Sequence, residues 1–224
     1  MVNFSAWTVL CAVLQFAALP ALLERVASVF FARLRPNLSA ADRGVLSQRF
    51  ARAVVALLLA QGGARAMLAQ GRMTMRGTTE VGQYYMLGCV VFYIFDSYLL
   101  WKQRARTYDL WVHHILAILQ YSYFLWAQVS EFGGCMALQT EFLVPWGFML
   151  FYFKINKLAA HPFFPVIAYG GIITLLCRIA IWSSLMYVLC GPFYHEAPLA
   201  LFVSCIVSSP FALFLDMLIG RAHV

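Results

Sequence analysis

The sequence predicts an all-α protein that crosses a membrane seven times as a bundle of helices. Hydrophobic residues make up 63% of the 224 residues, charged residues only 11%, and the mean hydropathy is +0.78. A soluble domain is nearer half apolar and a quarter charged, so this composition is typical of a polytopic membrane protein. The apolar residues occur in long runs, and no Pro-, Gly- or Ser-rich linker or low-complexity stretch interrupts them.

Six apolar runs are long enough for a helix that crosses a bilayer, which takes about 20 mostly apolar residues. These runs cover residues 4–23, 81–101, 110–127, 132–153, 166–189 and 197–219. A seventh, weaker run lies at about 50–69. Its apolar centre is short and lies between Arg52 and Arg65, so both side chains would have to reach toward the membrane surfaces.

The distribution of Lys and Arg favours counting the weak run as a span. Cytoplasmic segments of membrane proteins are enriched in these residues. With seven spans and a lumenal or external N-terminus, twelve of the 16 basic residues fall on the cytoplasmic side, including those between Arg25 and Arg52. Without the weak run, nine basic residues fall on one side of the membrane and six on the other. We therefore predict a cytoplasmic C-terminus and a cytoplasmic, unglycosylated Asn37.

The net charge of +7 does not predict a nucleic-acid partner, because the basic residues lie between apolar runs rather than on one face. Anchoring to anionic lipid and orienting the helices accounts for them. The six cysteines show no spacing typical of metal ligands. Cys135 and Cys190 fall at the predicted lumenal ends of two spans, where a disulfide is permitted.

Several ionisable side chains lie inside the predicted spans, where each costs about 2.5 kcal/mol or more at the bilayer centre. Asp96, His113, His114 and Asp216 are all a few residues from the cytoplasmic end of their span. At a rise of 1.5 Å per residue they share a layer about 5–8 Å below that boundary. A lone membrane histidine usually makes only an interhelical hydrogen bond. Two histidines and two aspartates at one depth favour a site.

Glu141 and Arg178 are expected deeper, near the midplane, where an ion pair is the simplest way to hold both. Such a pair could pin the helices or act directly in a reaction. Pro145 follows Glu141 by four residues and leaves the carbonyl at 141 without its helical donor. This predicts a kink that lines a cavity.

Neighbouring positions on a helix differ by about 100°, so His113 and His114 cannot point in one direction. Asp109 precedes His113 by one turn and could accept its N–H, which would set the tautomer. A carboxylate–histidine pair of this kind can act as a general base or a nucleophile. The two histidines alone lack the further ligands that a metal site needs, so we predict no metal.

In these residues the chain resembles the TLC-domain family of membrane proteins, which includes ceramide synthases and translocating chain-associated proteins. Four segments match in order: YYMLGCVVFYIFDSYLL with Asp96, DLWVHHILAI with the histidine pair, QTEFLVPWGFMLFYF with Glu141, and LLCRIAIW with Arg178. The resemblance covers about residues 45–220. It implies a six-helix membrane domain at 45–224 around a cavity open to the cytoplasm, in the endoplasmic reticulum. Residues 1–44 would form an added N-terminal span and basic loop.

In ceramide synthases the paired histidines catalyse transfer of an acyl group from acyl-CoA to the amine of a long-chain base. By position, the resemblance implies a catalytic role for His113 and His114, with Asp96 in support. The remaining polar residues would bind or support the substrate; they are Asp109, Glu141, Arg178 and Asp216. The implied partners are membrane lipids, with acyl-CoA as co-substrate, a long-chain base as acceptor and no bound cofactor.

The chain departs from the ceramide-synthase pattern at several places, and two of them lie close to the predicted site. Ala117 stands where a hydroxyl residue follows the histidines, and Gln139–Phe142 replace a His-Asp-x-x-Asp stretch. These departures favour a divergent TLC-domain lipid protein over a ceramide synthase proper. Three functions remain open: an acyltransferase or related lipid-modifying enzyme, a non-enzymatic lipid sensor or carrier, and a helper for protein biogenesis or cargo export. The sequence carries no signal of oligomeric state.

Overall fold

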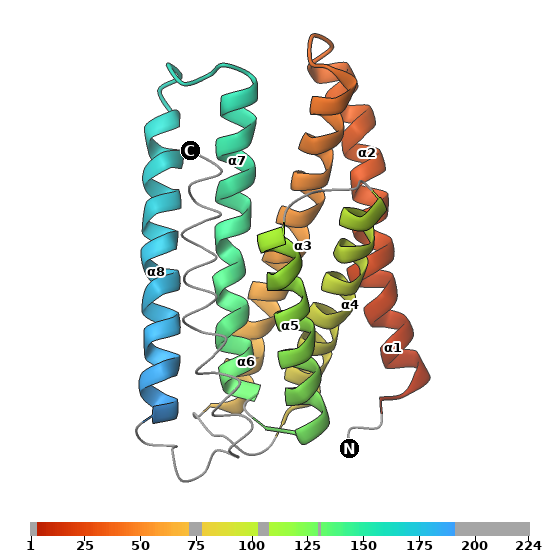
Figure 1. The fold of residues 1–224 in the computed structure, drawn as a ribbon, viewed down its shortest axis with the longest axis vertical. Coiled ribbons are helices and arrows are strands. Elements are labelled where there is room, and N and C mark those ends of the chain that lie inside the picture. Colours follow the sequence, from red (N-terminus) through yellow and green to blue (C-terminus); the bar gives the residue numbers. More distant parts are fainter. Residues whose placement is uncertain (1–3, 72–77, 103–107, 130, 191–224) are drawn as a thin grey trace.

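The computed structural model describes residues 4–71, 78–102, 108–129 and 131–190, and in these residues the chain forms a bundle of helices (Figure 1). Long helical segments that follow one another in the chain run in alternating directions along the long axis of the molecule. The elements in order are α1 (Ala6–Val13), the π-helix η1 (Leu14–Ala18), α2 (Leu19–Leu34), α3 (Ala40–Gln70), α4 (Glu80–Lys102), α5 (Tyr108–Ala127), α6 (Glu131–Leu138), the 3-10 helix η2 (Gln139–Phe142), α7 (Leu143–Ile155) and α8 (Phe164–Cys190).

Four helices of the described chain are long and apolar enough to cross a membrane. They are Ala6–Leu34, which we call the first rod, then α3, α4 and the Phe164–Val188 part of α8. The protein therefore has the character of a multi-pass membrane protein. The predicted span at 197–219, with Asp216, lies outside the described residues.

The first rod is longer than the predicted span at 4–23, because its helix continues to Leu34. Pro20 has no N–H for the carbonyl of Phe16, and its ring would crowd that carbonyl in a regular α-helix. The wider turn of η1, just before Pro20, accommodates this defect. Phe16 is fully buried within η1 and packs over Gly88 of α4, where a Cβ would collide with its ring.

α3 begins ten residues before the predicted weak span. Ser39 caps it, since its Oγ accepts the Asp42 N–H at 3.1 Å and donates to the Asp42 carboxylate at 2.7 Å. Gly71, with φ of 68°, ends it in the left-handed conformation that favours glycine. The predicted arginine-rich cytoplasmic loop is thus mostly helix, and only Arg35–Ser39 connect α2 to α3.

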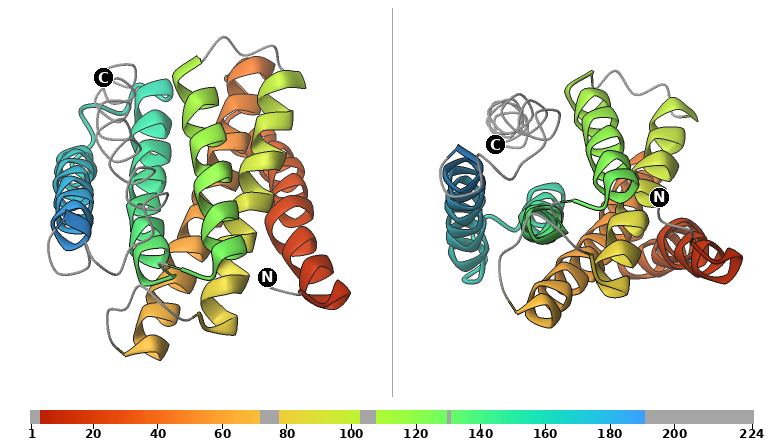
Figure 2. Two further views of the ribbon diagram at one scale, coloured as in Figure 1. Left: turned by 60° about the horizontal axis from the view of Figure 1, so that its bottom comes forward. Right: turned by 90° about the horizontal axis from the view of Figure 1, so that it is seen from below.

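α3 is the central element, since it packs against α2, α4, α6 and α7. Figure 2 shows it between α7 and the first rod. Small residues allow this close packing, as is common between membrane helices. A Cβ on Gly63 would lie 2.7 Å from the carbonyl oxygen of Cys135 in α6. The largest buried cluster gathers around this region and includes Phe16, Leu59, Met86, Phe124 and Leu138.

The predicted span at 132–153 is a single rod built from α6, η2 and α7. The expected irregularity near Pro145 takes the form of a tightened 3-10 turn, η2. Side chains of this turn bind backbone oxygens. Gln139 Nε2 donates to the Ala60 carbonyl at 2.8 Å, and Thr140 Oγ1 donates to the Ala137 carbonyl at 2.7 Å. These bonds fix the turn against α3 and leave Glu141 buried.

A second buried carboxylate caps α4 at the opposite end of that helix from Asp96. Glu131 is fully buried and accepts hydrogen bonds from the Thr79 backbone N–H and, at 2.5 Å, from Thr79 Oγ1. Gly82 has no room for a Cβ beside this carboxylate. A carboxylate at the N-terminus of a helix is stabilised by the helix dipole, so this cluster, in which Glu131 binds the amide just before α4, has a structural role.

The outer surfaces of the first rod and of α8 are apolar. Exposed side chains there include Trp7, Leu14, Tyr169, Ile172 and Ile173. Helix faces of this kind suit contact with lipid chains, which are as apolar as the side chains themselves. The polar groups, by contrast, gather inside the bundle.

Candidate functional site

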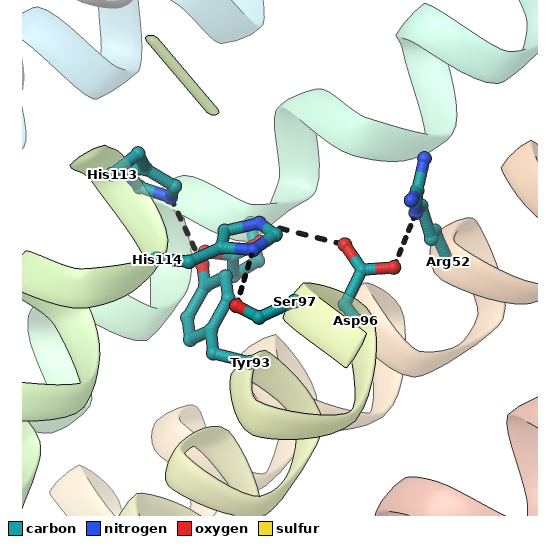
Figure 3. A network of polar contacts seen from close by, with 7 residues as sticks. Arg52, Tyr93, Asp96, Ser97, His113 and His114 are labelled. Atoms are coloured by element: carbon teal, nitrogen blue, oxygen red, sulfur yellow. Dashed lines mark hydrogen bonds and ion pairs between the residues drawn. The ribbon is translucent and has the colours of Figure 1, made fainter. Parts of the chain in front are cut away.

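The candidate site lies between α4 and α5, which pack side by side. Tyr93, Asp96 and Ser97 come from α4 at spacings of three and four residues, so they share one face of that helix. His113 and His114 come from α5 and meet that face (Figure 3). Contacts from α3, η2 and α8 complete a polar network inside the bundle.

Asp96 is the centre of the first half of this network. It is only 3% exposed, and its Oδ1 accepts a hydrogen bond from Arg52 Nε at 2.7 Å. Its Oδ2 lies 3.5 Å from His114 Nε2. The structure therefore brings one aspartate and one histidine of the predicted layer into contact. The guanidinium of Arg52 provides the positive charge that a buried carboxylate needs.

His114 has neighbours at both ring nitrogens. It is 2% exposed, its Nδ1 lies 3.2 Å from Ser97 Oγ, and its Nε2 faces Asp96. A carboxylate paired with arginine can only accept a hydrogen bond, so Nε2 carries the proton and Nδ1 accepts the hydroxyl hydrogen of Ser97. Both nitrogens of a neutral His114 are then occupied. This ring is held in place rather than left available for a reaction.

Tyr93 is the centre of the second half. Its hydroxyl donates to Glu141 Oε1 at 2.6 Å and lies 3.2 Å from His113 Nε2. Its ring also packs against both imidazoles, at 5.4 Å from His113 and 4.9 Å from His114 between ring centroids. Tyr93 is 4% exposed and Glu141 is 8% exposed. Tyr93 therefore joins the histidines to the glutamate that we expected at a deeper level.

The hydroxyl of Tyr93 has a single hydrogen, which it gives to Glu141. It can only accept from His113, so Nε2 of His113 carries the proton and Nδ1 has the free electron pair. Among the described side chains, Nδ1 of His113 has no hydrogen-bond partner in the structure. His113 thus offers a basic nitrogen, in contrast to His114.

Arg178 of α8 completes the site. It is 8% exposed, and its charge acts on both the carboxylate of Glu141 and the imidazole of His113. The charge of Arg178 acts on the Glu141 carboxylate, but the ion pairs of the described residues join Arg52 and His114 to Asp96, so the predicted Glu141–Arg178 ion pair stays a prediction. The two predicted layers are consequently one connected network, because Tyr93 lies one turn from Asp96 on α4 and reaches the deeper carboxylate.

The structure brings together five of the seven predicted site residues, which are Asp96, His113, His114, Glu141 and Arg178. Asp109 belongs to α5, but its side chain, like the whole of Asp216, lies outside what the structure describes. The expected bond from His113 to Asp109 therefore stays a prediction, while Nε2 of His113 lies 3.2 Å from the Tyr93 hydroxyl. In the described chain, no group of three His, Cys, Asp or Glu residues is arranged to hold a metal ion.

Three residues of the site were not predicted from the sequence. Arg52 was assigned to the membrane surface, whereas its side chain is directed to Asp96 and is only 24% exposed. Tyr93 and Ser97 were not singled out, although their spacing from Asp96 places all three on one helix face. Such spacing around a membrane aspartate is the signal that would have found them.

The sequence permitted a disulfide between Cys135 and Cys190, and the side chain of Cys190 lies outside what the structure describes. Cys135 is a free thiol in the structure. Its side chain is fully buried in the interior of the bundle, where it packs as a small apolar group.

Comparisons with known proteins found no matching family model, no matching curated protein and no matching solved structure.

Proposed function

We propose that this chain is a TLC-type membrane protein with seven spans and that it transfers an acyl group to a membrane lipid. The observation that carries this proposal is an Nδ1 of His113 that meets no partner among the described side chains, beside a second, fixed histidine in a buried network with two carboxylates. A histidine oriented by hydrogen bonds and left with one available nitrogen is the usual form of a general base.

The proposed reaction uses His113 as the base. Its Nδ1 accepts the proton of an amine or hydroxyl on the acceptor lipid as that group attacks the thioester carbonyl of acyl-CoA. The acyl group moves to the lipid as the C–S bond of the thioester breaks, and the departing thiolate takes the proton held by the site to leave as the free thiol. Asp96 and Arg52 form an ion pair that holds His114, whose ring lies 5.9 Å from that of His113 between centroids.

The proposed location is the membrane of the endoplasmic reticulum, with a lumenal N-terminus and a cytoplasmic C-terminus. In this orientation the histidine pair lies near the cytoplasmic boundary, where acyl-CoA is dissolved. The arginines between Arg25 and Arg52 lie at the same end and favour an anionic co-substrate. The lipid chain would lie between helices while the head group reaches the site.

A second candidate is a lipid sensor or carrier that uses the same network without turnover. The hydrogen bonds that Gln139 and Thr140 make favour this second candidate. In place of the acidic pair of ceramide synthases, these side chains donate to the backbone of Ala60 and Ala137. They contribute structure to the turn rather than carboxylates to the histidines.

Mass spectrometry of the purified protein distinguishes the two functions. We expect wild-type protein incubated with acyl-CoA and extracted membrane lipids to form acylated lipid. His113→Ala should reduce the rate by about 100-fold or more, the usual contribution of a general base. His161→Ala is the matched control, because His161 is exposed on the connection between α7 and α8.

Two results would contradict the enzyme. Wild-type rates in both His113→Ala and His114→Ala would exclude a catalytic pair. Lipid that co-purifies with wild-type protein and is never modified by it would favour the carrier, particularly if His114→Ala retains the same lipid.

A further inference from the structure

We propose that His113, Tyr93 and Glu141 form a proton relay. When His113 takes up a proton at Nδ1, it gives its Nε2 proton to Tyr93, and Tyr93 gives its own proton to Glu141. The relay adds a proton route to the proposed function. It rests on that function only for the identity of the substrate group that gives its proton to His113. The connection itself is a property of three side chains from α5, α4 and η2. It assigns to Tyr93 a part that neither the sequence nor the resemblance indicated.

The geometry of the relay is continuous. His113 Nε2 lies 3.2 Å from the Tyr93 oxygen, which lies 2.6 Å from Glu141 Oε1. The second distance is short for a hydroxyl–carboxylate bond, as expected when the acceptor is charged. Tyr93 and Glu141 are both buried, so water does not compete for these groups from the surface.

In the resting state, the number of protons on each group decides the direction of the two hydrogen bonds. Nε2 of His113 donates to Tyr93, and Tyr93 donates to a negatively charged Glu141. Burial disfavours the charged form of this carboxylate, whereas the charge of Arg178 from α8 and the hydrogen bond from Tyr93 favour it. In this state Nδ1 of His113 is the only nitrogen of the pair with an electron pair not used by a described residue.

The transfer step balances without any further reactant. A substrate proton binds Nδ1, the Nε2 proton moves to the Tyr93 oxygen, and the original Tyr93 proton moves to Glu141. The product state contains a neutral imidazole, a neutral tyrosine and a protonated glutamate, while the substrate has become negatively charged. Both hydrogen bonds remain, but each now points in the opposite direction, because Glu141 donates to Tyr93 and Tyr93 donates to Nε2.

His114 has no comparable route. Its Nε2 faces Asp96, whose charge is paired with Arg52, and its Nδ1 is occupied by Ser97. We therefore assign Tyr93 and Glu141 to His113 as positioning residues that act through it, and His114 to the support of the site. This division gives the two adjacent histidines different reactivity.

Two variants separate a relay from a structural contact. Glu141→Gln keeps an oxygen that accepts from the Tyr93 hydroxyl, but the amide cannot take up a proton. Tyr93→Phe removes both the acceptor for His113 and the donor for Glu141. Tyr121→Phe is the matched control, since Tyr121 is also buried in the bundle and its hydroxyl donates to the Gly134 carbonyl, outside the network.

The experiment reads the histidines directly, in full-length protein in lipid nanodiscs. Nitrogen-15 spectra of labelled imidazoles report which ring nitrogen carries the proton. Reaction with diethyl pyrocarbonate, followed by peptide mass spectrometry, reports the reactivity of each imidazole, with exposed His161 as the internal standard. Both readouts are independent of any lipid substrate.

We expect His113 to carry its proton on Nε2 in wild type, Glu141→Gln and Tyr121→Phe, and to lose this preference in Tyr93→Phe. The reagent should modify His113 faster than His114. Glu141→Gln and Tyr93→Phe should each slow the reaction at His113 by about tenfold or more, because no carboxylate then stabilises the charge that develops on the ring.

The relay is overturned if His113 of the wild type carries its proton on Nδ1, or if Glu141→Gln reacts at the wild-type rate. The second result would leave Tyr93 a purely structural contact. These outcomes differ from failure of the proposed function, which would appear as absent lipid acylation with the tautomer and reactivity pattern intact.

Discussion

At the scale of single residues, Asp96 determines how charge is arranged inside the bundle. One carboxylate receives Arg52 on one oxygen and faces His114 with the other. Removal of one member of a buried ion pair leaves the other without compensation, which costs more than the pair contributes. The site is therefore sensitive to single substitutions and tolerant of paired ones.

This arrangement predicts that Arg52→Gln lowers the free energy of unfolding by about 3 kcal/mol, because Asp96 is left buried and charged. Combining Arg52→Gln with Asp96→Asn should recover most of the loss, since two amides can bond to each other. Unfolding in detergent micelles with increasing denaturing surfactant measures both. Arg65→Gln, exposed on the same helix, is the control and should change stability by less than about 0.5 kcal/mol. The ion pair would be contradicted if the double variant loses as much unfolding free energy as the two single variants together.

Single residues also mark the limit of sequence-based prediction in this site. Asp96, His113 and His114 were predictable because ionisable groups are costly in an apolar run. Arg52 resembled the many arginines that orient membrane helices, and only its position on α3 opposite α4 reveals its partner. Tyr93 was not predictable alone, because tyrosine is common in apolar helices and its role depends on Glu141, 48 residues away.

At the scale of elements, hydropathy predicted where most helices lie but not where they end. The rods α4, α5 and α8 agree with the predicted spans to within a few residues. The first rod and α3 extend well past their apolar runs, because capping by Ser39 and packing continue the helices beyond the hydrophobic segment. The cluster of Phe31, Leu46 and Ala27 supplies that packing.

The contact between η1 and α4 gives a test of how closely the elements pack. Gly88→Ala would push a methyl group into the ring of Phe16, which is fully buried. We expect a loss of about 1–3 kcal/mol in unfolding free energy, the usual cost of overpacking. Gly147→Ala in α7 is the matched control, because a Cβ there meets nothing within 4 Å. Thermal unfolding of both variants in the same detergent measures the difference, and equal stability would contradict the packing.

At the scale of the whole molecule, the ends of α3 provide a test of the proposed orientation. Asn37 precedes this helix and Ala69 lies in its last turn, so the two residues are at opposite ends of it. In a variant with its cysteines replaced by serine, we expect Asn37→Cys in intact microsomes to react with a membrane-impermeant maleimide. Ala69→Cys should react only after the membrane is opened. The reverse pattern, or a glycan on Asn37, would invert the topology.

The length of α3 bears on where the site lies relative to water and to the lipid layer. Its 31 residues span about 46 Å, whereas the hydrocarbon layer is about 30 Å thick. An untilted α3 would project about 16 Å past the hydrocarbon, and the arginines of its first half favour projection at that end. Arg52 is twelve residues beyond Ala40, or about 18 Å along the axis. In the proposed orientation, this placement would put the Arg52–Asp96 pair at the boundary between water and lipid, within reach of a soluble reactant and a membrane-bound one.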